Sequence, residues 1–82
     1  MVSRFDAEML QELNVLGLFD LSSMQSGVKV HASAAPETVA AARRLYDKGL
    51  VTQPDGGYLT DLGVEAAMHA QTLATVLAGQ PA

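Results

Sequence analysis

The residues of this chain that could carry out chemistry are few and widely spaced. There are two histidines, His31 and His69, and no cysteine, which excludes disulfides, thiolate metal sites and a cysteine nucleophile. A zinc site needs three or four ligands, and neither histidine has another ligand at close spacing. The serine pair Ser22–Ser23 lacks a plausible Ser–His–Asp arrangement. The sequence therefore predicts no enzyme, no metal or cofactor, and no small-molecule substrate.

The basic residues form the one cluster that could bind a charged partner. Three of the five, Arg43, Arg44 and Lys48, fall within a predicted helix over residues 36–48. Lys and Arg contacts to phosphates supply much of the affinity of DNA-binding proteins, so these three are the candidate nucleic-acid-binding residues. Two acidic residues in the same helix leave a net charge of +1, and residues 49–82 hold no Lys or Arg. The alternative interpretation is a solvated helix face.

Length and charge limit the class of protein. The 82 residues suffice for a single domain, 1–82, with a frayed end at 79–82. The net charge of −4 argues against binding nucleic acid by charge alone. The N-terminus lacks a secretory signal, and the most apolar stretch is too polar for a membrane helix. We therefore expect a cytoplasmic protein.

The N-terminal segment predicts a helix. Asp6 suits the N-cap, Phe5 can pack onto Leu10 as a hydrophobic staple, and Gly17 can end the helix. Apolar residues recur at helical spacing and predict the inner face. The predicted inner residues are Phe5, Met9, Leu13 and Leu16, with Gln11, Glu12 and Asn14 in water.

The middle of the chain predicts a short strand and a second helix. A capping pattern in residues 22–26 favours one helical turn. Residues 28–31 alternate apolar and polar side chains, as a half-buried strand does. Pro36 suits the first position of a helix that ends at Gly49.

The C-terminal half predicts a β-hairpin and a long helix. The turn at residues 54–57, Pro-Asp-Gly-Gly, joins two arms within residues 50–60, and strand 28–31 is expected to complete a three-stranded sheet. Thr60 suits the N-cap of a final helix that runs to about Ala78. His69 is expected to be a partly buried packing residue of that helix.

The final helix has apolar residues on more than one face. The inner stripe is predicted to be Leu62, Ala66, Ala70, Leu73 and Leu77. Small or flexible apolar residues follow on a second face, and no charged residue occurs from Ala66 to Ala82. A helix apolar on two faces is usually buried on both. We therefore expect a homodimer with Val64 and Met68 at the interface.

Two resemblances concern fold and function. The helix, Gly-rich turn and Leu-Thr-Asp-Leu-Gly run within residues 36–67 resemble the recognition helix and wing of winged-helix domains. The Phe-Asp-Leu-Ser-Ser segment at 19–23, with Val-Lys-Val-His at 28–31, resembles a family of short proteobacterial proteins of unestablished function, some labelled DNA-binding. These resemblances imply a winged-helix-like, mostly helical α+β fold with three main helices and a small antiparallel sheet. Only four residues, however, separate His31 from Pro36, where a typical winged helix has a complete helix.

Two functions remain open on this basis. The first is a small DNA-binding or transcription-associated domain that uses Arg43, Arg44 and Lys48. The alternative is a protein–protein interaction module, homodimeric and without nucleic-acid binding.

Overall fold

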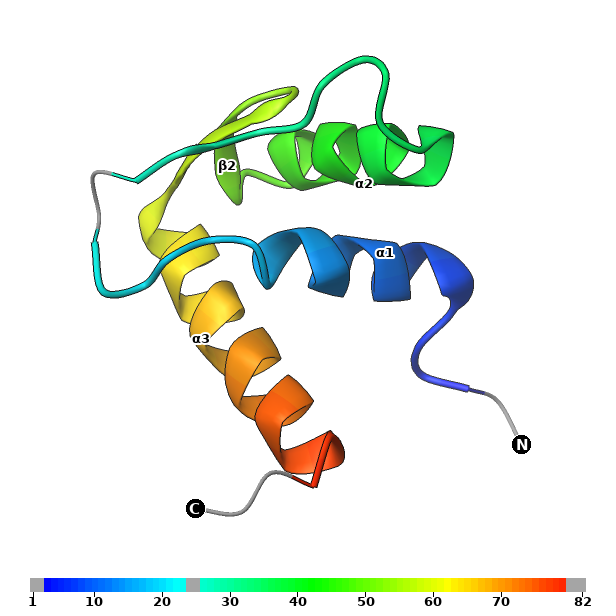
Figure 1. Ribbon diagram of the computed structural model, residues 1–82, viewed down its shortest axis with the longest axis vertical. Coiled ribbons are helices and arrows are strands. Elements are labelled where there is room, and N and C mark those ends of the chain that lie inside the picture. Colours follow the sequence, from blue (N-terminus) through cyan, green and yellow to red (C-terminus); the bar gives the residue numbers. More distant parts are fainter. Residues whose placement is uncertain (1–2, 24–25, 80–82) are drawn as a thin grey trace.

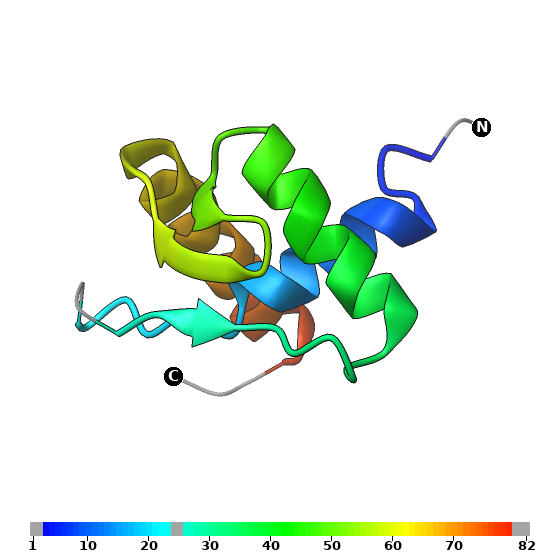
Figure 2. The ribbon, with the colours of Figure 1, turned by 90° about the horizontal axis from the view of Figure 1, so that it is seen from above.

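The computed structural model describes residues 3–23 and 26–79. Within these residues, three helices and a three-stranded antiparallel sheet form an α+β domain of winged-helix-like topology (Figures 1 and 2), which confirms the expected fold class. The elements follow in the order α1 (Ala7–Leu16), β1 (Val28–Lys29), α2 (Pro36–Asp47), β2 (Val51–Gln53), β3 (Gly56–Leu59) and α3 (Asp61–Leu77). Helix α1 packs beneath α2, and α3 leads away from the sheet (Figure 1).

The helix termini lie where the sequence predicts them. The Asp6 carboxylate accepts a hydrogen bond from the Met9 amide (2.8 Å), and the Thr60 hydroxyl accepts one from the Gly63 amide (3.0 Å). Each bond satisfies an amide that the first turn of a helix leaves unpaired. Pro36 begins α2, where its missing amide hydrogen costs nothing.

The sheet has the order β1-β3-β2, so the second arm of the hairpin is the central strand. β1 pairs with β3 antiparallel, which confirms the predicted three-stranded sheet, although β1 spans only two residues. Gly56 lies so close to β1 that a Cβ there would stand 2.4 Å from the Val28 carbonyl oxygen, and its φ of +120° also favours glycine. The helical turn expected at residues 22–26 includes Met24 and Gln25, which lie outside the described residues.

The inner face of α3 differs from the prediction. Its buried residues are Gly63, Ala67 and Ala70, whereas Leu62, Leu73 and Leu77 are exposed. A Cβ on Gly63 would lie 1.9 Å from the Leu50 carbonyl oxygen. The helix therefore approaches the α2–β2 connection along its small residues, and this rotation leaves the larger leucines outside.

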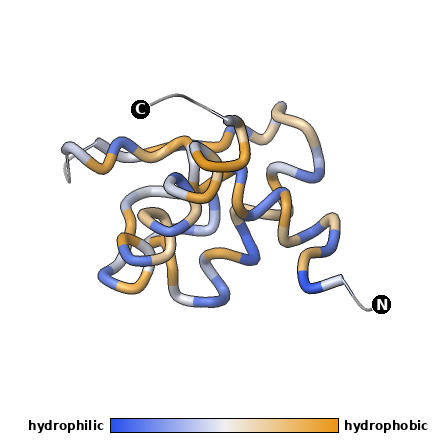
Figure 3. Tube along the Cα trace, turned by 90° about the horizontal axis from the view of Figure 1, so that it is seen from below, coloured by the Kyte–Doolittle hydropathy of each residue, from blue (hydrophilic) through white to orange (hydrophobic). Residues whose placement is uncertain are grey.

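The inner face of α1 is also shifted from the prediction. Glu12, Val15 and Leu16 are buried, whereas Phe5 and Met9 are exposed. Hydrophobic residues recur along the helices between hydrophilic ones (Figure 3), so the residue pattern leaves the rotation of a helix poorly determined.

The hydrophobic core is small and lies where the three helices and β2 meet. Ten hydrophobic residues of the described chain are buried, and four of them are alanines. Eleven large hydrophobic residues are exposed. The described chain therefore exposes more large apolar side chains than it buries. The main core cluster is Val15, Leu16, Phe19, Ala41, Leu45, Val51, Ala67 and Ala70.

Candidate interaction surfaces

Two of the predicted nucleic-acid-binding residues converge on one buried carboxylate of α1. Arg44 donates through Nε to Glu12 Oε2 (2.9 Å), and Lys48 Nζ donates to Glu12 Oε1. Arg44 also donates through Nη2 to the backbone oxygen of Glu8 (3.1 Å). Glu12 is only 7% exposed. Arg44 and Lys48 therefore join α2 to α1, and Glu12 together with Glu8, whose carboxylate lies 3.8 Å from Arg44, compensates their charge within the molecule.

The two cations decide the ionisation of Glu12. Burial alone would raise the pKa of this carboxyl, but the hydrogen bonds from Lys48 and Arg44 and their positive charges outweigh burial and lower the pKa below its ordinary value. Glu12 is therefore ionised at neutral pH and holds both cations in place. The prediction that Glu12 lies in water is wrong. Its partners lie 32 and 36 positions further along the chain, where no local pattern can indicate them.

Arg43 points away from this cluster. Its side chain is largely exposed, with Nε 3.9 Å from Asp47 Oδ1 one helical turn away, which is a weak surface pair. The structure therefore does not bring Arg43, Arg44 and Lys48 onto one basic face.

A second arrangement of cations lies between α2, β1 and the hairpin turn. Lys29 and Arg43 border an open cavity of about 450 Å³ with Val30, Val39 and Pro54 in its lining. Lys29 Nζ lies 3.7 Å from Asp55 Oδ2, again an exposed pair. Lys29 and Arg43 thus lie on one cavity next to the predicted wing, each beside an exposed carboxylate.

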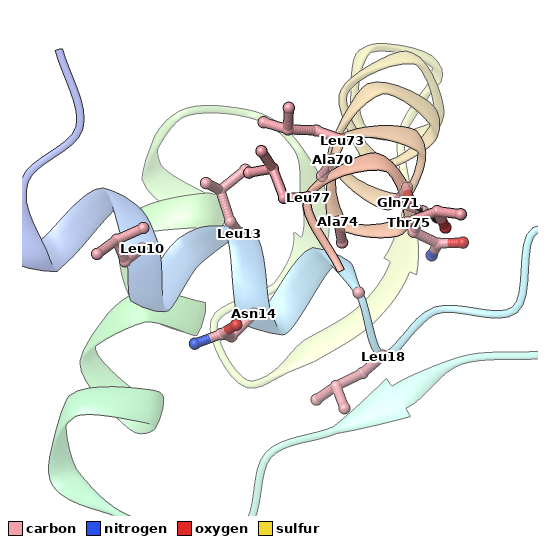
Figure 4. Close-up of a pocket in the computed structure, with 11 residues that line it drawn as sticks. Leu10, Leu13, Asn14, Leu18, Ala70, Gln71, Leu73, Ala74, Thr75 and Leu77 are labelled. Carbon is pink, nitrogen blue, oxygen red and sulfur yellow. Dashed lines mark hydrogen bonds between the residues drawn. The ribbon is translucent and has the colours of Figure 1, made fainter. Parts of the chain in front are cut away.

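An apolar groove lies between α1 and the C-terminal half of α3, and we call it the α1–α3 groove. It has a volume of about 560 Å³ and carries no charged side chain. Figure 4 shows leucines from both helices around it, with Leu18 from the segment after α1 at one end. The lining residues are Leu10, Leu13, Asn14, Gly17, Leu18, Ala70, Gln71, Leu73, Ala74, Thr75 and Leu77.

Gln71 fixes the two walls of the groove relative to each other. Its Nε2 donates to the backbone oxygens of Leu16 (3.2 Å) and Phe19 (2.8 Å) at the end of α1. The Leu16 carbonyl at the end of α1 also accepts from the Phe19 amide (3.5 Å), so Gln71 adds a second donor there and joins α3 to the segment that follows α1. The amide thus takes part in internal bonds, and what the groove offers a partner is mainly aliphatic surface.

The last part of α3 extends beyond the core. Ala70 is the last buried residue of this 17-residue helix. Val76 is 67% exposed and Leu77 is 76% exposed. Leu73 and Leu77 face the groove, so a projecting apolar helix end and an apolar groove lie in one continuous patch (Figure 4).

The residues predicted for the dimer interface lie elsewhere on α3. Val64 is half-buried and Met68 is exposed, and neither lines the groove. The prediction that they form an interface stays a prediction. Sequence reasoning missed the groove itself. The exposed Leu73 and Leu77 could have indicated it only if the burial of Gly63, Ala67 and Ala70 had been recognised.

The other candidate residues do not gather into a site. His31 and His69 are both exposed, so the expectation that His69 is a partly buried packing residue is wrong. Ser22 donates through its hydroxyl (2.6 Å) and its amide (2.9 Å) to Asp20 Oδ1, and both bonds lower the pKa of that carboxyl. Among the described residues, no three His, Asp or Glu side chains are placed to hold a metal ion, and no helix is long and apolar enough to cross a membrane.

Comparison with known proteins identifies the family of this chain but not its activity. The chain matches a protein family described as a family of unknown function (DUF5669) over residues 3–78, and it belongs to that family. No curated protein and no solved structure matches it. Its function has to be inferred from the surfaces described above.

Proposed function

We propose that this protein is a non-catalytic protein–protein interaction module whose working surface is the α1–α3 groove, and that it takes an apolar helix of another protein chain. The observation that carries the proposal is the combination of a charge-free groove with exposed leucines on both walls. Apolar faces of helices dock into such grooves through side chains at helical spacing. Exposed apolar patches of this kind on small domains mark sites of association.

The arrangement of charge supports the same proposal. Glu12 pairs with Arg44 and Lys48, two of the three residues predicted to bind a nucleic acid. The net charge of the chain is −4. The cations of helix α2 thus hold α1 in place. The surface that stays exposed and apolar is the α1–α3 groove.

A titration followed by NMR tests this function. The probe is a designed 14-residue peptide with leucines on one helical face and only serine and glutamine elsewhere, so that charge plays no part. We expect its addition to shift the methyl signals of Leu10, Leu18 and Leu73, and the replacement Leu73→Glu to abolish those shifts. The titration is run at a protein concentration at which the chain is monomeric, so that no second copy competes for the groove, and unchanged groove methyl signals at millimolar peptide then contradict the proposal.

Nucleic-acid binding is the second candidate function, favoured by the winged-helix-like order of elements and by the convergence of Lys29 and Arg43 on one cavity beside the hairpin. Those two residues, rather than Arg44 and Lys48, would then make the main phosphate contacts. A titration with a DNA duplex at ~50 mM salt tests it, because low salt favours phosphate contacts. We expect the slope of log binding constant against log salt concentration to fall by about two in the double variant Lys29→Ala/Arg43→Ala, and this result would support nucleic-acid binding. No binding by the unaltered protein would exclude it.

A further inference from the structure

The α1–α3 groove and the end of α3 expose a run of large aliphatic side chains. Leu10, Leu18, Leu73, Val76 and Leu77 are each between 38% and 76% exposed. Monomeric proteins rarely leave a large contiguous apolar patch uncovered.

The charge distribution restricts what can cover the groove. No charged side chain lines it, and no charged residue occurs from Ala66 onward in the sequence. A strongly basic or acidic partner would find no complementary charge there. Two copies of this acidic chain, in contrast, repel each other less across this patch than across a charged one. The charge distribution therefore excludes strongly charged partners and is compatible with a second copy.

The shape of the patch also fits a second copy. A two-fold interface is self-complementary, so one patch must offer both a recess and something to fill it. Here the recess is the α1–α3 groove, and the filler is the projecting end of α3, with Leu73, Val76 and Leu77 at its surface. Ala70 and Ala74 in the groove lining have small side chains, which leave room for a helix to approach closely. A cavity of about 560 Å³ is large enough to take several aliphatic side chains.

The stability of the helix end points the same way. The segment from Gln71 to Leu77 contains no buried residue. Short helices are only marginally stable in water unless one face packs against something. Docking into a second copy would bury the leucines of this segment and supply that packing.

We infer that the chain forms a two-fold dimer in which the end of α3 of each copy occupies the α1–α3 groove of the other. This inference rests on the proposed function, because it names the partner of the same groove. It differs from the sequence-based expectation of an interface at Val64 and Met68, since neither of these residues lines the groove.

Sedimentation of the complete chain between about 5 and 500 µM tests the inference. We expect the unaltered protein to be dimeric at the upper end of this range. Leu73→Glu and Leu77→Glu should each weaken the dimer about 100-fold, because a hot-spot loss of about tenfold enters twice in a symmetric interface. The matched control is Met68→Glu, an exposed position of the same helix outside the groove, which should change the dimer constant less than about threefold.

Each result has a defined meaning. A protein that stays monomeric at 500 µM overturns the dimer, and the peptide titration then decides separately whether the groove binds a helix at all. Dissociation by Met68→Glu with no effect of Leu73→Glu overturns the placement of the interface in the groove. Circular dichroism checks that each variant is folded. Leu77→Glu keeps the test decisive if Leu73→Glu does not fold, since Leu77 is 76% exposed and belongs to no core cluster.

Discussion

The replacement Glu12→Gln tests whether the buried carboxylate joins α1 to α2. Glutamine keeps the shape of the side chain but removes its charge, and its single carbonyl oxygen cannot accept from Arg44 and Lys48 as two carboxylate oxygens do. A hydrogen bond to a charged group contributes about 1.5–3 kcal/mol, but Lys48 is half exposed, so its share is closer to that of a surface pair, below about 1 kcal/mol. We expect the free energy of unfolding to fall by about 1–2 kcal/mol at pH 7.

That loss is large for this domain. An 82-residue chain has a stability of about 4–12 kcal/mol on the usual scale per residue. With a urea slope of about 1 kcal/mol per molar, the unfolding midpoint should shift by about 1–2 M. Urea denaturation followed by circular dichroism measures it, at one low protein concentration of about 2 µM so that self-association does not enter.

The pH dependence provides a second check of the same reasoning. The pKa of Glu12 is lowered on folding from its ordinary value near 4.5. Its contribution is therefore fully present above about pH 4.5 and is lost as the pH falls through the lower folded-state value. The difference between the unaltered protein and Glu12→Gln should shrink as the pH falls below this value.

The matched control is Glu8→Gln, which removes a carboxylate 3.8 Å from Arg44 but largely exposed to solvent. It should change the stability by less than about 0.5 kcal/mol. The reasoning is refuted if Glu12→Gln is as stable as the unaltered protein at pH 7, if its deficit is unchanged in acid, or if the control costs as much.

Two further predictions concern the packing of α3. Gly63→Ala should lower the melting temperature by at least about 5 °C in a thermal scan, because the new Cβ would meet the Leu50 carbonyl at 1.9 Å and overpacking costs about 1–3 kcal/mol. Gln71→Ala should cost about 1–2 kcal/mol in urea denaturation, since the carbonyls of Leu16 and Phe19 lose their side-chain donor. Gln71→Glu should cost more, because a carboxylate would face the same two oxygens without a proton to donate.

Controls for these two variants lie close by. Gly17→Ala places its Cβ no closer than 3.3 Å to the Asn14 carbonyl, at an ordinary φ, and should change the melting temperature little. Thr72→Ala, next to Gln71 but exposed, should be close to neutral. A Gly63→Ala protein as stable as Gly17→Ala would show that α3 can move away from the α2–β2 connection at little cost.

The sequence predicted what depends on neighbouring residues. The caps at Asp6 and Thr60, the start of α2 at Pro36 and the hairpin turn each depend on residues a few positions apart, and the structure confirms them. Pairing of residues 28–29 with β3 is the long-range contact that was also predicted, because a hairpin alone has an unpaired edge.

What the sequence left undetermined was the rotation of helices about their axes. Both α1 and α3 carry apolar residues around much of their circumference, so periodicity favoured the leucine-rich stripes. The structure instead buries Glu12 through cations on α2, and it brings α3 close through Gly63. The burial of Glu12 and the close approach at Gly63 both depend on contacts between segments far apart in the sequence, which no local pattern predicts. The α1–α3 groove results from these helix rotations, so the sequence pattern could not predict it either.

The hairpin turn has a consequence for how related chains can vary in length. The amide of Val30, just after β1, donates to the carbonyl of Asp55 at the tip of the hairpin (2.8 Å). A surface hairpin usually tolerates added residues at its tip. Here extra residues between Pro54 and Asp55 would move the acceptor away from Val30 and release the segment that leads into α2. We therefore expect relatives of this chain to keep a turn of constant length, and to place insertions elsewhere.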